Sequence, residues 1–211
     1  MEEALIIPDL GIKIQLTMAL LRRDPLHHTY ADYFSWPDDE RYELIDGVAY
    51  VKEPPAPSRS HQELVGELYH QIRLALEGKR WRAYVAPFDV RLPKAGEPDD
   101  LIDTVVQPDV VIVRDLSKLD KRGMRGAPDW IAEVLSPATT SHDQIVKIPV
   151  YERAGVLEVW LVHPIDRTLT IHRLENERYG IPIVVELKGR TAINALPGVS
   201  IDWERLPAVL T

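Results

Sequence analysis

Residues 130–135 have the sequence Trp130-Ile131-Ala132-Glu133-Val134-Leu135. All its residues except Glu133 are apolar, which predicts a strand buried on both faces of a central sheet. Because side chains alternate along a strand, Glu133 points to the same face as Ile131 and Leu135. A buried carboxylate is costly unless it is compensated, and a bound cation is a common compensation. An edge-strand charge that discourages aggregation is the alternative interpretation of Glu133.

A second apolar stretch, residues 105–113, carries Asp109 after Gln107-Pro108. The residues after Asp109 are apolar on both faces, which again indicates a central strand. Pro108 cannot donate a ladder hydrogen bond, so it marks a strand start or a bulge. Asp109 is therefore expected near a strand end, where the sheet opens to solvent. A structural aspartate bonded to loop amides is the alternative.

Asp109 and Glu133 together predict a metal site if their strands are neighbours. Two adjacent carboxylates repel each other unless a cation lies between them. Oxygen ligands suit Mg²⁺ or Mn²⁺, and the absence of cysteine excludes thiolate sites. Such an ion can activate a water molecule and neutralise charge on a phosphate. The pair therefore indicates metal-dependent cleavage of phosphodiesters.

Lys147 follows on a helix predicted at 141–154 and is expected to stabilise charge on the phosphate. The alternative is an ion pair within the helix, because Asp143 stands four residues earlier in the favourable order. Tyr151 lies one turn after Lys147 and is interpreted as a core residue.

Glu43 and His61 are weaker candidates for the same site. Glu43 lies in the first arm of a hairpin predicted from Asp46-Gly47, and it is expected to extend the metal site. His61 follows Ser60, which is expected to cap a helix as part of a capping box with Glu63. The imidazole is expected to contact phosphate or carry a proton. A plain surface histidine is the alternative.

Composition bounds the class of protein. The 211 residues are 45% apolar and 27% charged, which is typical of one globular domain. No apolar run approaches the roughly 18 residues that span a bilayer, and the first four residues are acidic rather than basic. With no cysteine, nothing indicates an oxidising compartment, so we expect a cytoplasmic protein without a membrane partner.

The formal net charge of -8 argues against avid binding of DNA over the whole surface. Arg114, Lys118, Lys121, Arg122 and Arg125 form a local basic strip that could contact nucleic acid. A solvated surface loop is the alternative.

Hydrophobic periodicity predicts an α/β (α+β) fold with a central mixed sheet. The expected helices are 29–34, 60–78 and 141–154, and the expected strands are 81–92, 105–113, 130–135, 157–163 and 169–173. We expect one nuclease-like domain over residues 1–211 with a core at about 29–173. The arm before residue 25 and the tail after residue 180 are expected to be extensions of that core, used in a homodimer.

A set of motifs stands in fixed order along the chain: Tyr42-Glu43-Leu44-Ile45-Asp46-Gly47, His61 at a helix start, Gln107-Pro108-Asp109-Val110, Glu133-Val134-Leu135-Ser136-Pro137, Asp143, Lys147 to Tyr151, and Ala154 to Pro164. Their joint order and spacing, over about 29–173, resemble the Uma2 family. That family is restriction-endonuclease-like and belongs to the PD-(D/E)XK nuclease superfamily.

The resemblance implies a restriction-endonuclease-like core, with Asp109 and Glu133 as metal ligands. It also implies a departure from the superfamily signature, because an E-x-K pattern requires lysine where this chain has Leu135. In Uma2-like sequences the lysine stands on the helix that follows the strand, and Lys147 is the corresponding residue here. Pro149, two residues after Lys147, is expected to kink that helix or to start it anew, which affects how far Lys147 reaches.

Two functions follow from these observations. The first is a Mg²⁺-dependent endonuclease, acting on DNA as a homodimer, with Mn²⁺ able to substitute. The second is an inactive nuclease-like scaffold that only binds partners or oligomerises, which the acidic charge and the displaced lysine favour.

Overall fold

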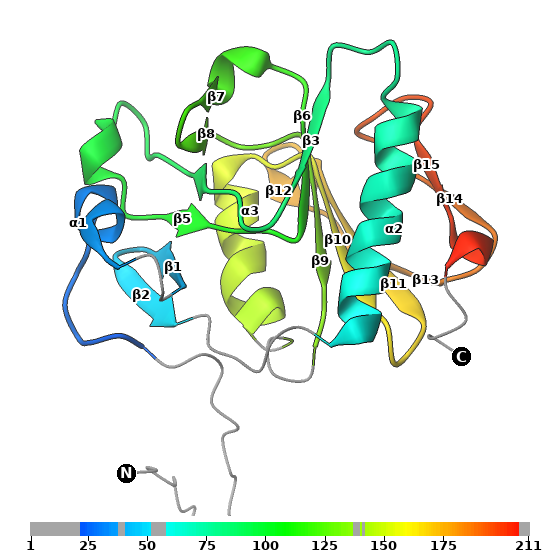
Figure 1. The fold of residues 1–211 in the computed structure, drawn as a ribbon, viewed down its shortest axis with the longest axis horizontal. Coiled ribbons are helices and arrows are strands. Elements are labelled where there is room, and N and C mark those ends of the chain that lie inside the picture. The colour runs from blue at the N-terminus through cyan, green and yellow to red at the C-terminus, as the bar shows by residue number, and fades with distance from the viewer. Residues whose placement is uncertain (1–21, 38–40, 52–57, 137–139, 141, 207–211) are drawn as a thin grey trace, which may run out of the picture.

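The computed structural model describes residues 22–37, 41–51, 58–136, 140 and 142–206. It contains two mixed sheets, a short terminal hairpin and a few helices (Figure 1). The expected fold class, a mixed sheet flanked by helices, is confirmed. The greater part of the expected N-terminal arm lies outside the described residues.

The larger sheet carries the candidate residues and has the strand order β12-β11-β10-β9-β6-β3, with β13 also beside β11. Its strands are β3 (Arg82–Val85), β6 (Val110–Val113), β9 (Trp130–Val134), β10 (Glu158–His163), β11 (Thr168–Glu175), β12 (Arg178–Tyr179) and β13 (Ile183–Glu186). Strands β9 and β10 are parallel, whereas β6 and β9 are antiparallel. The strands expected at 130–135, 157–163 and 169–173 are confirmed.

The smaller sheet has the order β2-β1-β5-β4-β8-β7. Its strands are β1 (Tyr42–Ile45), β2 (Val48–Val51), β4 (Val90–Arg91), β5 (Val105–Val106), β7 (Leu119–Asp120) and β8 (Gly123–Arg125). The hairpin at Asp46-Gly47 is confirmed, and both turn residues have the positive φ angles of such a turn.

Two strand predictions were wrong as single strands, because 81–92 and 105–113 each divide between the two sheets. The first divides into β3 and β4, and the second into β5 and β6. Pro87 and Pro108 lie at the breaks and cannot donate ladder hydrogen bonds. The second break places Asp109 directly before β6, close to the strand end where we expected it.

The helical elements are α1 (Tyr30–Ser35), α2 (Arg59–Ala75), α3 (Ile148–Ala154), the 3₁₀ turns η1 (Asp99–Leu101), η2 (Leu116–Lys118) and η4 (Trp203–Arg205), and a π-helical segment η3 (His142–Lys147). Helix α2 begins earlier than expected. Ser58, not Ser60, is its N-cap, and Ser58 Oγ accepts a hydrogen bond from His61 N at 3.2 Å. The capping box of Ser60 with Glu63 was wrong because Ser60 lies inside the helix.

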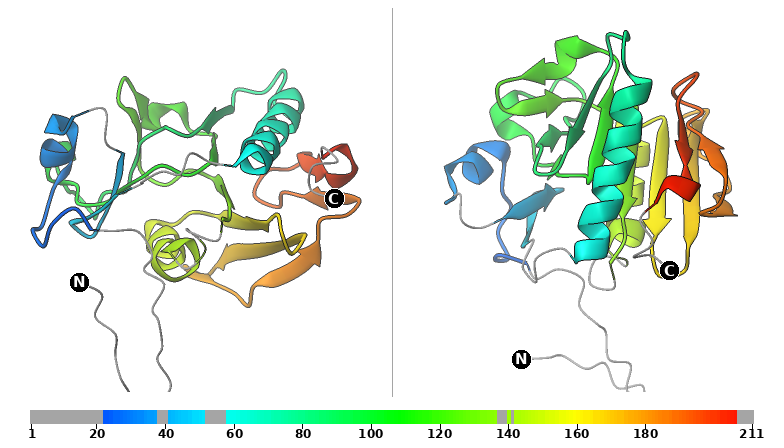
Figure 2. Two further views of the ribbon diagram at one scale, coloured as in Figure 1. Left: turned by 60° about the horizontal axis from the view of Figure 1, so that its bottom comes forward. Right: turned by 45° about the vertical axis from the view of Figure 1, so that its right-hand side comes forward.

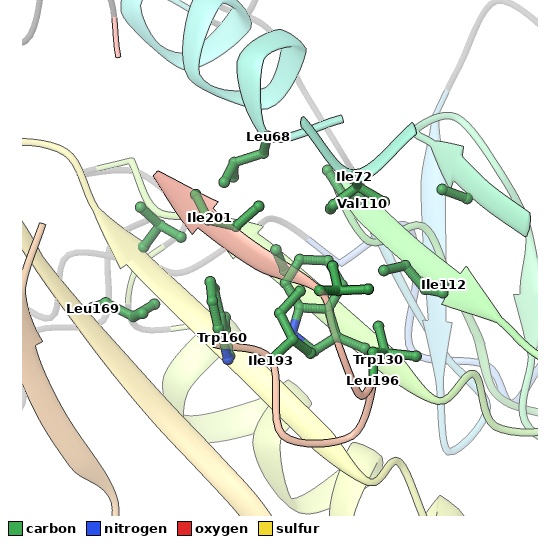
Figure 3. Close-up of a cluster of buried hydrophobic side chains, with 14 of the residues drawn as sticks. Leu68, Ile72, Val110, Ile112, Trp130, Trp160, Leu169, Ile193, Leu196 and Ile201 are labelled. Carbon is green, nitrogen blue, oxygen red and sulfur yellow. The ribbon is translucent and has the colours of Figure 1, made fainter. Parts of the chain in front are cut away.

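One face of the larger sheet packs against α2 and the C-terminal segment (Figure 3). Leu68 and Ile72 of α2 lie over this core, and Trp130 packs edge-on against Trp160 with ring centroids 5.3 Å apart. The C-terminal segment includes β14 (Arg190–Ala192) and β15 (Ser200–Asp202). It buries the side chains of Leu187, Ile193, Leu196, Val199, Ile201 and Trp203 in this core.

A buried carboxylate fixes this segment to β10. Glu158 is 1% exposed, and it accepts hydrogen bonds from Trp160 Nε1 at 2.6 Å and Ala195 N at 3.0 Å. Residues between 187 and 203 are thus packed into the core on this face of the larger sheet.

The opposite face of the larger sheet packs against α3 and residues of the smaller sheet (Figure 2). Val150 and Tyr151 of α3 are buried there beside Ile131 and Leu161, and Val90 and Met124 belong to the same core. Glu133 shares a face with Ile131, as the alternation of side chains predicted. None of the helices in the described ranges is both long and apolar enough to span a membrane.

Candidate active site

Asp109 and Glu133 meet where β6 and β9 lie side by side. Val110 pairs with Ala132 in the antiparallel register, so Asp109 lies opposite Glu133. Asp109 Oδ2 accepts a hydrogen bond from Val134 N at 2.7 Å, and Glu133 Oε2 lies 3.4 Å from Asp109 N. The structure thus brings together the two carboxylates that the sequence singled out. The hydrogen bond from Val134 also shows that Asp109 has a structural role.

Lys147 reaches into this pair from η3. Its Nζ lies 2.7 Å from Glu133 Oε1, 3.1 Å from Glu43 Oε1 and 3.2 Å from Asp143 Oδ1. The ion pair with Asp143 is therefore present, but it is one of three. Pro149 lies in the first turn of α3, where its missing N–H is tolerated. The Lys147 side chain is 1% exposed, and its ammonium is surrounded by carboxylates.

Several polar side chains are buried on the short π-helical segment η3. His142, Asp143 and Lys147 are all buried there. Such wide turns are rare, and they occur frequently at functional sites. His142 Nε2 lies 3.8 Å from Glu43 Oε2, and its ring contacts Tyr50 edge-on. The sequence predicts an ordinary helix here, and its pattern does not point to His142 or Asp143 as site residues.

Tyr151 is a further residue that sequence reasoning missed. Its hydroxyl donates a 2.5 Å hydrogen bond to Glu133 Oε1, the oxygen that also binds Lys147. The prediction that Tyr151 is a core residue is confirmed, because its side chain is fully buried between α3 and the larger sheet. The spacing of four residues from Lys147 was the available signal, because residues i and i+4 share a helix face.

Glu43 lies on β1 and is fully buried. Its Oε1 accepts a hydrogen bond from Gln107 N at 2.8 Å. The Gln107 side chain in turn donates to Asp89 Oδ1 at 2.9 Å and to the Tyr33 hydroxyl at 3.1 Å. These contacts hold Glu43 against Lys147, so the smaller sheet contributes one wall of the site.

His61 lies on the first turn of α2 at the rim of the site. Its Nε2 is 3.4 Å from Asp109 Oδ1, and the two side chains are 16% and 17% exposed. Glu133 and Lys147 are almost fully buried, whereas His61 and Asp109 retain contact with solvent. The structure therefore places His61, a weaker candidate from the sequence, beside Asp109 at the solvent-accessible end of the site.

The expected basic strip, in contrast, is occupied by local ion pairs. Arg122 and Arg125 each lie within 4 Å of Asp99, and Arg114 lies 4.0 Å from Asp129. These contacts agree with the alternative of a surface loop with its own acidic partners, formed here around β7 and β8.

The electrostatics of the site are dominated by excess negative charge. Burial raises the pKa of Glu133 to about 7; Lys147 opposes this rise, and Asp143, Asp109 and Glu43 add to it. Burial alone would lower the pKa of Lys147, but Glu133, Glu43 and Asp143 hold it well above its usual value. One ammonium thus faces several carboxylates, so the site favours additional positive charge.

The carboxylates of Asp109 and Glu133 are the candidate ligands for a divalent ion. Within the described ranges, no group of three or more histidine and carboxylate side chains is arranged as a ready metal cage. Mg²⁺ does not require one, since it usually binds through one or two carboxylates and keeps waters or takes substrate phosphates. The Asp109–Glu133 pair, with oxygen donors only, fits that requirement.

Tyr151→Phe is expected to lower the free energy of unfolding by about 1.5–3 kcal/mol, because the variant removes a buried hydrogen bond to a carboxylate. Urea unfolding measures this change. Tyr179→Phe is the matched control, since its hydroxyl donates to the neutral Val156 carbonyl at 3.0 Å. We expect about 0.5–1.5 kcal/mol for that control. Equal losses would show that Glu133 does not depend on Tyr151.

Comparison with known proteins bears on the fold and the family. The chain resembles the crystal structure of a protein from Anabaena variabilis ATCC 29413, described as "a putative nuclease belonging to DUF820", with a TM-score of 0.67 and 18% sequence identity over 87% of this chain and 99% of that chain. A comparison with curated protein sequences gave no significant match. The family model Uma2, described as "Putative restriction endonuclease", matches residues 30–204. Because this match spans most of the sequence and includes the whole candidate site, the chain belongs to the nuclease-like Uma2 family.

Proposed function

We propose that this protein is a Mg²⁺-dependent endonuclease that hydrolyses phosphodiester bonds in DNA, with Mn²⁺ able to replace Mg²⁺. The observation that carries the proposal is the meeting of Asp109, Glu133 and Lys147 at the end of β6 and along β9. Family membership and the nuclease-like fold support it. We further propose that the protein acts as a homodimer.

Asp109 and Glu133 would hold the ion, which when bound supplies an activated water and neutralises charge on the phosphate. Lys147 contributes a fixed positive charge beside Glu133 that stabilises negative charge on the phosphate oxygens. Glu43 and Asp143 keep the ammonium in place from two further sides. His61 is the partly exposed group beside Asp109, so it is suited to contact phosphate or carry a proton to solvent.

A nuclease-like scaffold that binds partners without cleaving them is the second candidate. Lys147 lies within 3.2 Å of Glu133, Glu43 and Asp143 and partly neutralises them, and these groups are buried. A site of this kind can be retained for stability alone. The overall charge of -8 also favours partners other than DNA.

Calorimetric titration with Mn²⁺ separates these two functions without assuming a substrate. We expect saturable binding by the wild-type protein and none by the Asp109→Asn/Glu133→Gln variant, which keeps the shape of both side chains but removes their charge. The titration is repeated with duplex DNA present, because substrate phosphates can complete a magnesium site. Absence of binding under both conditions would favour the scaffold.

A further inference from the structure

Strand β13 (Ile183–Glu186) forms an outer edge of the larger sheet. It pairs with β11 on one side, and no other strand in the described part of the chain pairs with it. Figures 1 and 2 show it beyond β11, away from α3. An edge strand presents unpaired N–H and C=O groups and is a template for pairing with another chain, unless charges, prolines or a covering element protect it.

Three exposed residues on this edge are apolar. Ile181 is 95% exposed, Val184 63% and Ile183 44%. Glu186 is the one charged residue within β13, and Pro182 stands just before the strand. The edge therefore combines exposed hydrophobic side chains with exposed backbone groups, which suits a second strand.

The register with β11 determines which backbone groups point outward. Leu187 N donates to Arg167 O at 2.9 Å, and the same register pairs Val185 with Leu169 and Ile183 with Ile171. Because hydrogen-bonded and non-hydrogen-bonded pairs alternate, Ile183, Val185 and Leu187 direct their N–H groups to β11. The N–H groups of Val184 and Glu186 point to the open side.

We propose that β13 pairs antiparallel with β13 of a second copy of this chain, in the register centred on Val184. Val184 then exchanges two hydrogen bonds with Val184 of the second copy, and Glu186 N donates to Pro182 O on each side. Pro182 has no N–H, and Glu186 O already accepts from Lys188 N at 2.8 Å. This register therefore uses every outward donor between Pro182 and Glu186 and competes with no existing bond.

The register next to it fits less well. If the pairing is centred on Val185, Val184 N must donate to Glu186 O, which Lys188 already occupies. Centring on Val184 also places Lys188 opposite Gly180 of the second copy. A Cβ at Gly180 would lie 3.6 Å from Glu175 Oε2, so Lys188 faces an acidic neighbour there. This charge complementarity supports a second copy of the chain as the partner of β13. The pairing would join the larger sheets of the two copies into one continuous sheet.

A single introduced cysteine tests the register, because the chain contains no cysteine of its own. In the proposed pairing the two Val184 Cα atoms are about 5.5 Å apart, within the usual range for a disulfide. Val184→Cys is expected to form a disulfide-linked dimer under mild oxidation. Glu186→Cys is the matched control on the same face, because its two copies would lie about 13 Å apart. Equal cross-linking of both variants, or of neither, would overturn the register.

Sedimentation of the otherwise unmodified chain tests the interface itself. The wild-type protein is expected to be a dimer and Val184→Lys a monomer, since the substitution places two like charges directly opposite each other. Ile165→Lys is the control, because Ile165 is 77% exposed but stands in the turn between β10 and β11, outside the register of β11 with β13. A monomeric wild type, or a dimer that Val184→Lys does not weaken, would contradict the proposal. Neither measurement uses cleavage, so this outcome is independent of the proposed nuclease activity.

Discussion

Lys147→Met is expected to lower the free energy of unfolding by about 3–5 kcal/mol, because removing one partner of a buried ion pair leaves uncompensated charge. Nζ lies within 3.2 Å of Glu133, Glu43 and Asp143, and the side chain is 1% exposed. Methionine has similar length and fills the same space, so the loss reports charge rather than a cavity. Urea unfolding at constant pH measures it.

The same variant should show a particular pH dependence. The pKa of Glu133 is raised to about 7, chiefly by burial, and Lys147 limits that rise. A carboxyl group with a pKa near 4.5 in the unfolded state and a higher pKa in the folded state stabilises the fold at pH values below the unfolded pKa. This stabilisation is lost as the pH rises through the folded pKa. Removing Lys147 raises the folded pKa of Glu133 further. The loss of stability should therefore be larger at pH 8 than at pH 6.

Lys94→Met is the control for this prediction. Lys94 Nζ lies 2.7 Å from Asp103 Oδ2, as close as Lys147 to Glu133, but its side chain is 52% exposed. Because about half of the Lys94 side chain is in contact with water, this ion pair is screened and is expected to contribute about 1 kcal/mol or less. A loss for Lys147→Met no larger than that of Lys94→Met would show that the buried carboxylates do not depend on the lysine.

Local sequence patterns predicted those parts of the fold that local physics determines. The apolar run around Glu133, the Asp46-Gly47 turn and the apolar stripe of α2 each correspond to an observed element. The division of 81–92 and 105–113 between two sheets was not predicted, because pairing partners far along the chain decide it. The burial of Ile193 and Trp203 against the larger sheet likewise depends on long-range packing.

The residues of the candidate site also differ in how far the sequence alone predicts them. Asp109 and Glu133 were recognisable because each carboxylate stands in or beside a run that must be buried. Tyr151 was not, because a tyrosine on an apolar helix face is usually core, and its hydrogen bond to Glu133 appears only when η3 and α3 pack on β9. Asp143 was interpreted only as a helix partner of Lys147, which it also is.

Asp109→Asn is expected to reduce metal-dependent DNA cleavage at least about 100-fold, because a metal ion contributes several kcal/mol to stabilising charge in the transition state. The substitution removes the charge that would bind the ion but keeps an oxygen that can accept from Val134 N, now at 2.7 Å. The fold should therefore persist, which circular dichroism and urea unfolding verify. Cleavage is followed on plasmid DNA with Mg²⁺ and with Mn²⁺.

Asp129→Asn provides a closely matched control for the loss of cleavage. Asp129 also directly precedes a strand of the same pair, its side chain is 16% exposed, and it accepts a backbone hydrogen bond from Arg114 N at 2.8 Å. Because β6 and β9 are antiparallel, Asp129 lies at the opposite end of the pair from Asp109. If loss of any carboxylate at a strand end reduced cleavage, both variants would cleave DNA more slowly. If Asp109 binds the metal ion, only Asp109→Asn loses cleavage. Cleavage by Asp109→Asn at the wild-type rate would exclude Asp109 as an essential metal ligand and would contradict the proposed site.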